Sequence, residues 1–159
     1  MSSKQIISRY AALFGRHIDG VFDAFELFTG DFNEAESHTV TVLSSVWSEF
    51  SIVDPNFRDA VVLDRTWQQL HRIPDPTIPL EPDRLSEPPL LGEWSATNPT
   101  DAAEAAAILY EARRRSPMVD WPLLVLMERT ALTVELYARI AQLTPTEANA
   151  RLTAARMAA

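Results

Sequence analysis

Hydrophobic side chains recur every three or four residues along most of the chain, the spacing that gathers them on one side of an α-helix. The spacing occurs in two groups of segments, residues 1–72 and 99–159, which a proline-rich stretch separates. The helices that it predicts lie within residues 6–28, 33–50, 55–72, 98–115, 119–143 and 144–157. We therefore predict an all-α fold of about six helices, organised as one domain over residues 1–159.

The most hydrophobic of these segments runs from Val119 to Leu143, and we predict that it is a buried helix at the centre of the fold. Its first part, Trp121–Met127, is a run of seven uncharged residues, and the polar residues after it follow one stripe. A helix that is apolar on nearly all sides is normally buried. The uncharged run is far shorter than the ~20 residues that cross a bilayer, so we expect no membrane span.

Local signals mark where several helices begin and end. Gly30 is expected to end the first helix, and Gly15 and Gly20 are expected to loosen or interrupt it. Asp54–Pro55 is typical of an N-cap followed by the first helical position. Thr144–Glu147 has the pattern of a capping box, which predicts the start of the last helix.

Residues 73–99 break the helical pattern with seven prolines, which lack the N–H group that helices and inner strands require. Large apolar residues alternate with these prolines, among them Ile78, Leu85 and Trp94. A freely exposed linker rarely contains so many. We predict an extended strap that packs over the helices or over a second copy of the protein.

The net charge of −8 is unevenly distributed along the chain. Residues 19–64 contain ten acids and a single basic residue, Arg58, which gives this segment a charge of −9. Binding to nucleic acid or an anionic membrane depends on Lys and Arg, so this half of the chain is a poor candidate for either. Its charge favours a cationic partner.

Other features of the composition narrow the class of protein. The absence of cysteine excludes disulfides, a thiolate nucleophile and Cys-ligated zinc. The first residues lack the apolar core of a secretory signal, so we expect a cytoplasmic protein. Thirteen arginines against the single Lys4 are typical of a GC-rich bacterial genome.

The strongest candidate binding surface is an acidic stripe on the first helix. Asp19, Asp23 and Glu26 are spaced so that they share one side of a helix, next to an apolar stripe. With three further acids they form the predicted partner-binding set: Asp19, Asp23, Glu26, Asp31, Glu34 and Glu36. We expect a basic protein partner, as for inhibitors, immunity proteins or adaptors. The alternative is a solvated face that only maintains solubility.

A second candidate, residues 135–152, resembles a helix-turn-helix DNA-binding motif, with Ala138 at the small packing position. Its second helix would present Thr146, Asn149, Arg151 and Arg156 to the major groove. Two residues favour an ordinary helical hairpin instead. Gln142 occupies the turn position usually held by glycine, and Glu147 would bring negative charge toward phosphate.

Evidence for catalysis is weak. Glu34 and His38 are one helical turn apart, but a bundle metal site needs a second such pair. No metalloprotease, nucleophile-elbow or phosphate-loop motif occurs. We expect no metal or cofactor and a non-enzymatic protein. A helical enzyme with a carboxylate-lined pocket is a further alternative.

Self-association is a separate prediction. The uncharged run Trp121–Met127 and the strap of residues 73–99 offer more apolar surface than six short helices would cover. A homodimer formed through either segment is therefore expected, with a compact monomer as the alternative.

Overall fold

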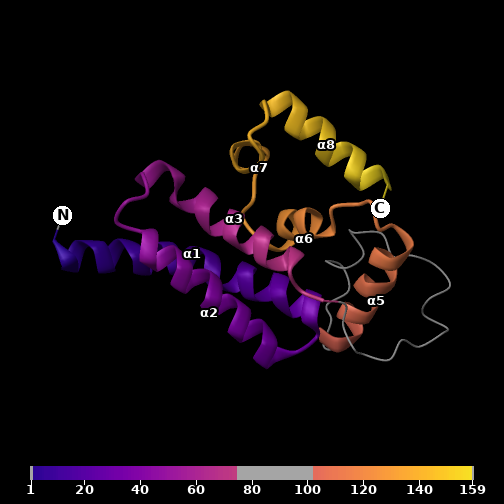
Figure 1. The fold of residues 1–159 in the computed structure, drawn as a ribbon, viewed down its shortest axis with the longest axis horizontal. Coiled ribbons are helices and arrows are strands. Elements are labelled where there is room, and N and C mark those ends of the chain that lie inside the picture. The colour runs from indigo at the N-terminus through magenta and orange to yellow at the C-terminus, as the bar shows by residue number, and fades with distance from the viewer. Residues whose placement is uncertain (1, 75–101, 159) are drawn as a thin grey trace.

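A computed structural model of the chain describes residues 2–74 and 102–158, and these residues form helices and no β-strand. The elements, in chain order, are α1 (Ser3–Thr29), α2 (Phe32–Glu49), the short 3₁₀ helix η1 (Pro55–Phe57), α3 (Arg58–His71), α5 (Ala102–Arg115), α6 (Trp121–Arg129), α7 (Val134–Ala141) and α8 (Pro145–Ala158) (Figure 1). The predicted all-α fold is confirmed. The predicted strap, apart from its first two residues, lies outside the described residues.

α1 is the longest described helix and packs against α2, α3, α5 and α6. Ser2 caps its start in a capping box, and Gly30, in the left-handed conformation at φ 68°, ends it as predicted. The interruption expected near Gly15 and Gly20 does not occur. Gly20 has a different role, because a Cβ there would lie 2.6 Å from the carbonyl oxygen of Arg129. The glycine thus allows α1 and the end of α6 to approach closely.

The prediction of one continuous helix over residues 119–143 is wrong, because this segment forms two helices, α6 and α7. The Thr130 hydroxyl donates to the carbonyl of Leu126, and Thr130 itself is extended. The Thr133 hydroxyl then accepts from the Leu136 N–H as the N-cap of α7. Threonine hydroxyls compete with the helical backbone in this way, which explains the break.

The prediction that the start of this segment is buried is correct, since Trp121–Leu126 are all buried in the core. α6 packs against α1, α3 and α8 inside a single chain. Six of the seven residues predicted to form a homodimer interface, Trp121–Leu126, are thus buried within the single chain, and Met127 is partly buried.

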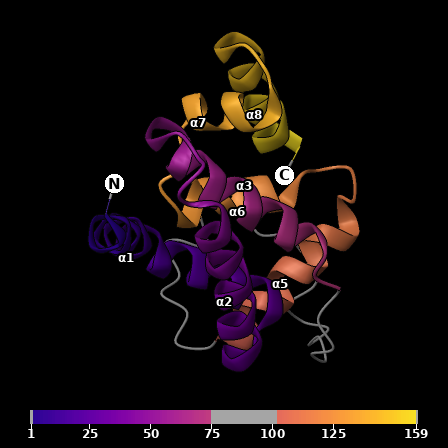
Figure 2. The same ribbon diagram turned by 60° about the vertical axis from the view of Figure 1, so that its left-hand side comes forward.

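α7 and α8 form an upper layer over α3 and α6, while α2 and α5 lie on the other side of the molecule (Figures 1 and 2). α8 contributes only Ala148 and Leu152 to the buried side. Two large apolar side chains of these helices are exposed, Trp47 of α2 at 44% and Met157 of α8 at 84%. None of the described helices combines the length and the hydrophobicity that a membrane crossing requires.

Candidate functional site

The acidic stripe predicted on the first helix is present on α1. Asp19 and Asp23 are exposed and Glu26 is partly exposed, with one helical turn between successive carboxylates. Partial burial raises the pKa of Asp23 and the charge of Asp19 raises it further, while Arg129 acts in the opposite direction. The two aspartates therefore repel each other, although the opposite charge of Arg129 has the larger effect on the pKa of Asp23.

The three acids expected to extend the stripe have different positions. The Asp31 carboxylate accepts a hydrogen bond from the Glu34 N–H at 2.9 Å and caps α2. Glu34 and Glu36 flank the buried Ala35, so they lie on opposite sides of α2. Only Glu36 lies one turn from Phe32 on the same side, so the six predicted residues do not form one patch.

An exposed aromatic side chain adjoins this stripe, and sequence reasoning did not single it out. Phe32, at the start of α2, is 60% exposed. Its ring packs edge-on against that of Phe22, with centroids 5.1 Å apart. Phe22 lies three residues after Asp19 and four before Glu26, so the aromatic pair lies directly beside the carboxylates.

Further apolar side chains extend this surface along both helices. Val40 of α2 is 58% exposed. Near the end of α2, the Trp47 ring packs edge-on against the Tyr10 ring of α1, with ring centroids 4.6 Å apart. On α1, partly buried side chains recur every four residues up to Phe22. We call this surface the hairpin face; it comprises Phe14, Ile18 and Phe22 of α1 with Phe32, Val40 and Trp47 of α2.

Half of the ten acids between positions 19 and 64 are already engaged within the fold. Burial alone would raise the pKa of Asp59, but hydrogen bonds from His17, at 2.6 Å, and Arg16 lower it. Arg65 pairs with both Glu49 and Asp64. The remaining two cap helices: Asp31 and Asp54. The negative charge available to a partner is thus concentrated on α1 and the first turns of α2.

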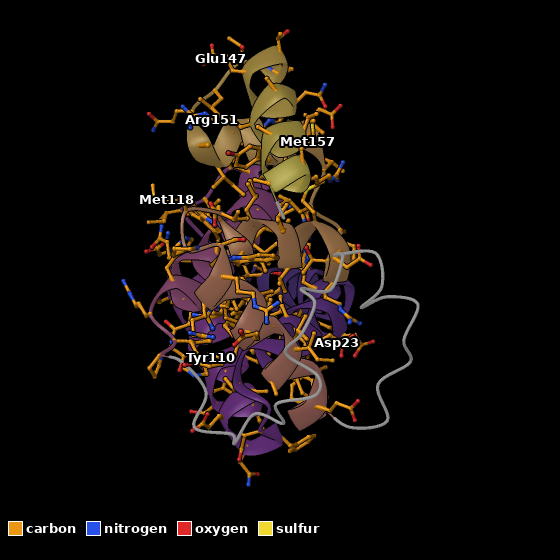
Figure 3. The ribbon with its side chains drawn as sticks, turned by 90° about the vertical axis from the view of Figure 1, so that its right-hand side faces the viewer. Asp23, Tyr110, Met118, Glu147, Arg151 and Met157 are labelled. Carbon is orange, nitrogen blue, oxygen red and sulfur yellow. The ribbon has the colours of Figure 1, made fainter. Side chains whose placement is uncertain are left out.

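The second candidate consists of two helices, α7 and α8, joined by a short turn. α7 ends at Gln142, which adopts the left-handed conformation (φ 57°, ψ 46°) that a glycine usually supplies in such a turn. Ala138, at the small packing position, is buried, as are Ala148 and Leu152 of α8, and Leu143 in the turn is partly buried. The four predicted DNA-reading residues all lie on the exposed side of α8: Thr146, Asn149, Arg151 and Arg156. Figure 3 shows Asp23 far from Glu147 and Arg151, so the two candidate surfaces are separate.

A pocket of 580 Å³ lies between the end of α3, α5 and the loop before α6, and Tyr110 and Met118 are among the residues that line it. Asp120 is the single carboxylate in its lining, which also includes His71 and two arginines of α5. That carboxylate caps α6 and pairs with His71 at 3.3 Å. The lining therefore differs from the carboxylate-lined pocket that the enzyme alternative predicts.

Glu34 and His38, one helical turn apart, belong to no group of three or more His, Asp or Glu side chains that could hold a metal ion among the described residues. His38 has structural contacts instead. Its ring stacks on Phe25, and its Nδ1 lies 2.9 Å from the Gln69 amide nitrogen.

Comparison of the chain with known proteins finds no matching family model, no matching curated protein and no matching solved structure.

Proposed function

We propose that the chain is a non-enzymatic binding protein that docks a basic partner protein on the hairpin face and the adjacent carboxylates of α1. The observation that carries this proposal is the contact between the exposed Phe32 and the partly buried Phe22, which lies directly beside Asp19 and Glu26. Single exposed hydrophobic residues are common on proteins and need no explanation. A run of them beside an acidic stripe is typical of a docking surface, in which aromatic anchors supply binding energy and charges give orientation.

The same group of side chains fits arginine and lysine for two physical reasons. A guanidinium placed over an aromatic ring gains about 0.5–2 kcal/mol, depending on how completely it is desolvated. A carboxylate within reach adds a charge-assisted hydrogen bond, which is shorter and stronger than a neutral one. An inhibitor, immunity protein or adaptor acting on a basic target would use both interactions.

The proposal can be tested by affinity capture from a lysate of the source cells, with the full-length chain immobilised. We expect the chain to retain a basic protein in a salt-sensitive manner. The double variant Asp19→Lys with Asp23→Lys should lose it while keeping the helical circular dichroism of the parent. Retention of the same partner by this double variant would refute the proposal.

A matched pair of single variants sharpens this test. Glu36 lies on the side of α2 that carries Phe32, whereas Glu34 lies on the opposite side. Glu36→Lys should therefore weaken capture, and Glu34→Lys, with the same change of charge on the same helix, should leave it unchanged. Equal losses in the two variants would show that total charge, and not this face, controls capture.

One observation also favours the second candidate function, DNA binding by α7 and α8. Gln142 adopts the left-handed turn conformation, which removes the main sequence objection to a helix-turn-helix. This function ranks second because residues 134–158 contain three arginines and two glutamates, little excess charge for phosphate contacts. Fluorescence anisotropy with mixed duplex DNA at low salt tests it: binding should require Arg151 and Arg156, and no binding at micromolar protein excludes it.

A further inference from the structure

The hairpin face has the form of an incomplete helical bundle. α1 and α2 run antiparallel, and α3 covers one side of the pair, where His17 contacts Asp59 and His38 contacts Gln69. On the other side, apolar side chains of both helices are exposed or partly exposed, and no other described element is recorded against Phe32 or Val40. A pair of packed helices has a groove between the helices on each of its two sides, and a groove lined by apolar side chains can hold a third helix.

We infer that the segment docked on the hairpin face is an amphipathic α-helix with arginine or lysine along its edges, an inference that rests on the function proposed above. The apolar residues of the face follow helical spacing on both sides of the seam: Phe14, Ile18 and Phe22 are four apart, and Phe32 and Val40 are eight apart. A helix lying along the seam meets such rows with its own residues at i, i+4 and i+7. An extended strand, with its two-residue period, would place every second side chain away from them.

Charge decides which helix fits. The carboxylates of Asp19 and Glu26 border the face, and that of Glu36 lies between Phe32 and Val40 within it. A second copy of this chain would bring the same carboxylates against them, which like-charge repulsion disfavours. Residues 75–101 contain six acids and one arginine, so their charge also has the wrong sign. A basic helix of another protein is the occupant that complements this border.

The length of the face sets the length of the ligand. Phe32 and Trp47 are fifteen residues apart on α2, a distance of about 22 Å along a helix. A partner helix of about four turns covers the whole seam. Leucine or phenylalanine should form its apolar stripe, with basic residues on the flanks that face α1 and the first turns of α2.

Three labelled sixteen-residue peptides titrated into the full-length chain test this inference by fluorescence anisotropy. The first is a Leu/Arg amphipathic helix, the second has the same composition in scrambled order, and the third replaces arginine with glutamate. We expect the first to bind about tenfold or more tightly than either of the others, the size of a hot-spot effect. Equal binding of the ordered and scrambled peptides would overturn the helical form of the ligand.

Variants of the chain locate the binding to the face. Val40→Lys should weaken binding of the first peptide about tenfold. Met157→Lys is the matched control, because Met157 is also an exposed apolar residue but lies on α8. This variant should bind the first peptide as tightly as the parent chain does. Equal losses in both variants, or none in Val40→Lys, would place the peptide elsewhere and overturn the inference.

The competing occupants give distinct results. If the parent chain is a dimer by light scattering and Val40→Lys is a monomer, the face binds a second copy and the inference fails. It also fails if a synthetic peptide of residues 75–101 competes with the Leu/Arg helix. Capture of a basic protein that depends on Asp19 and Asp23, without binding of any helical peptide, would retain the proposed function and reject only the helix.

Discussion

Substituting the two glycines of α1 by alanine should have opposite effects on stability. Both lie inside the same helix, so the intrinsic preference of alanine over glycine contributes equally to both variants. Their surroundings differ. A Cβ at Gly15 would meet nothing within 4 Å, whereas a Cβ at Gly20 would lie 2.6 Å from the carbonyl oxygen of Arg129 and 3.1 Å from the Cα of Thr130. Both of those neighbours are backbone atoms, which cannot rotate away.

The expected magnitudes follow from these contacts. Gly15→Ala should stabilise the protein by about 0.8–1 kcal/mol, the difference between the helix propensities of the two residues. Gly20→Ala has the same gain, but it must separate α1 from the end of α6, and overpacking of this kind costs about 1–3 kcal/mol. The difference in stability between the two variants measures the cost of overpacking at Gly20, because the gain in helix propensity is the same in both.

Urea denaturation followed by circular dichroism measures the free energies of unfolding of the parent and both variants. We expect Gly15→Ala to be the most stable and Gly20→Ala to be about 1–3 kcal/mol less stable than Gly15→Ala, with similar m-values. In thermal unfolding this difference corresponds to about 2–4 °C per kcal/mol for a chain of this size. A Gly20→Ala variant as stable as Gly15→Ala would refute the close packing of α1 on α6.

Three other predictions follow from single side chains. Burial alone would raise the pKa of Asp59, but hydrogen bonds from His17 and Arg16 lower it. The ionised Asp59 carboxylate should therefore stabilise the fold fully above the unfolded pKa of ~3.9. This stabilisation should disappear as the pH falls through the lower pKa of the folded protein. The stability difference between the parent and Asp59→Asn, from urea denaturation at several pH values, should therefore shrink in acid; a constant difference would contradict the pairing. Gln142→Gly should stabilise the fold by about 0.5–1 kcal/mol, because glycine adopts the left-handed conformation without a Cβ penalty, and a lower denaturation midpoint would argue against that conformation. Asp19→Asn should lower the pKa of Asp23 by removing a neighbouring negative charge, and an unchanged value in an NMR titration would show that the two carboxylates are too far apart to interact.

Sequence signals that act within a few residues predicted the fold well. Gly30 ends α1 and Thr144–Glu147 begins α8 as expected, because capping depends only on the local chain. Asp54–Pro55 also begins a helix, but this is the short 3₁₀ helix η1, and α3 follows it from Arg58. The break between α6 and α7 was missed because apolar residues continue through it, so hydrophobic periodicity gave no warning. The available signal was the pair Thr130 and Thr133, whose hydroxyls bond to the backbone on either side of the break.

The candidate site could be predicted only in part. Four-residue spacing places Asp19, Asp23 and Glu26 together, because all three lie on one helix. The same geometry could have separated Glu34 from Glu36, since residues two apart on a helix point in nearly opposite directions. The contact between Phe22 and Phe32 depends on how α1 folds back on α2. No pattern along the chain encodes that contact, so Phe32 was not recognised as a candidate.

The position of the acidic residues, more than their number, separates docking from simple solubility. Solubility depends mainly on total charge, and the substitutions Glu34→Lys and Glu36→Lys change the net charge identically, from −8 to −6. Docking depends on which carboxylates border the exposed aromatic pair, and only Glu36 lies on the side of Phe32. Phe32 lies in contact with Phe22 beside the stripe and, with Val40 and Trp47, forms a run of exposed apolar side chains that charge alone does not account for. The two variants therefore separate the two explanations, because only the docking explanation requires them to behave differently.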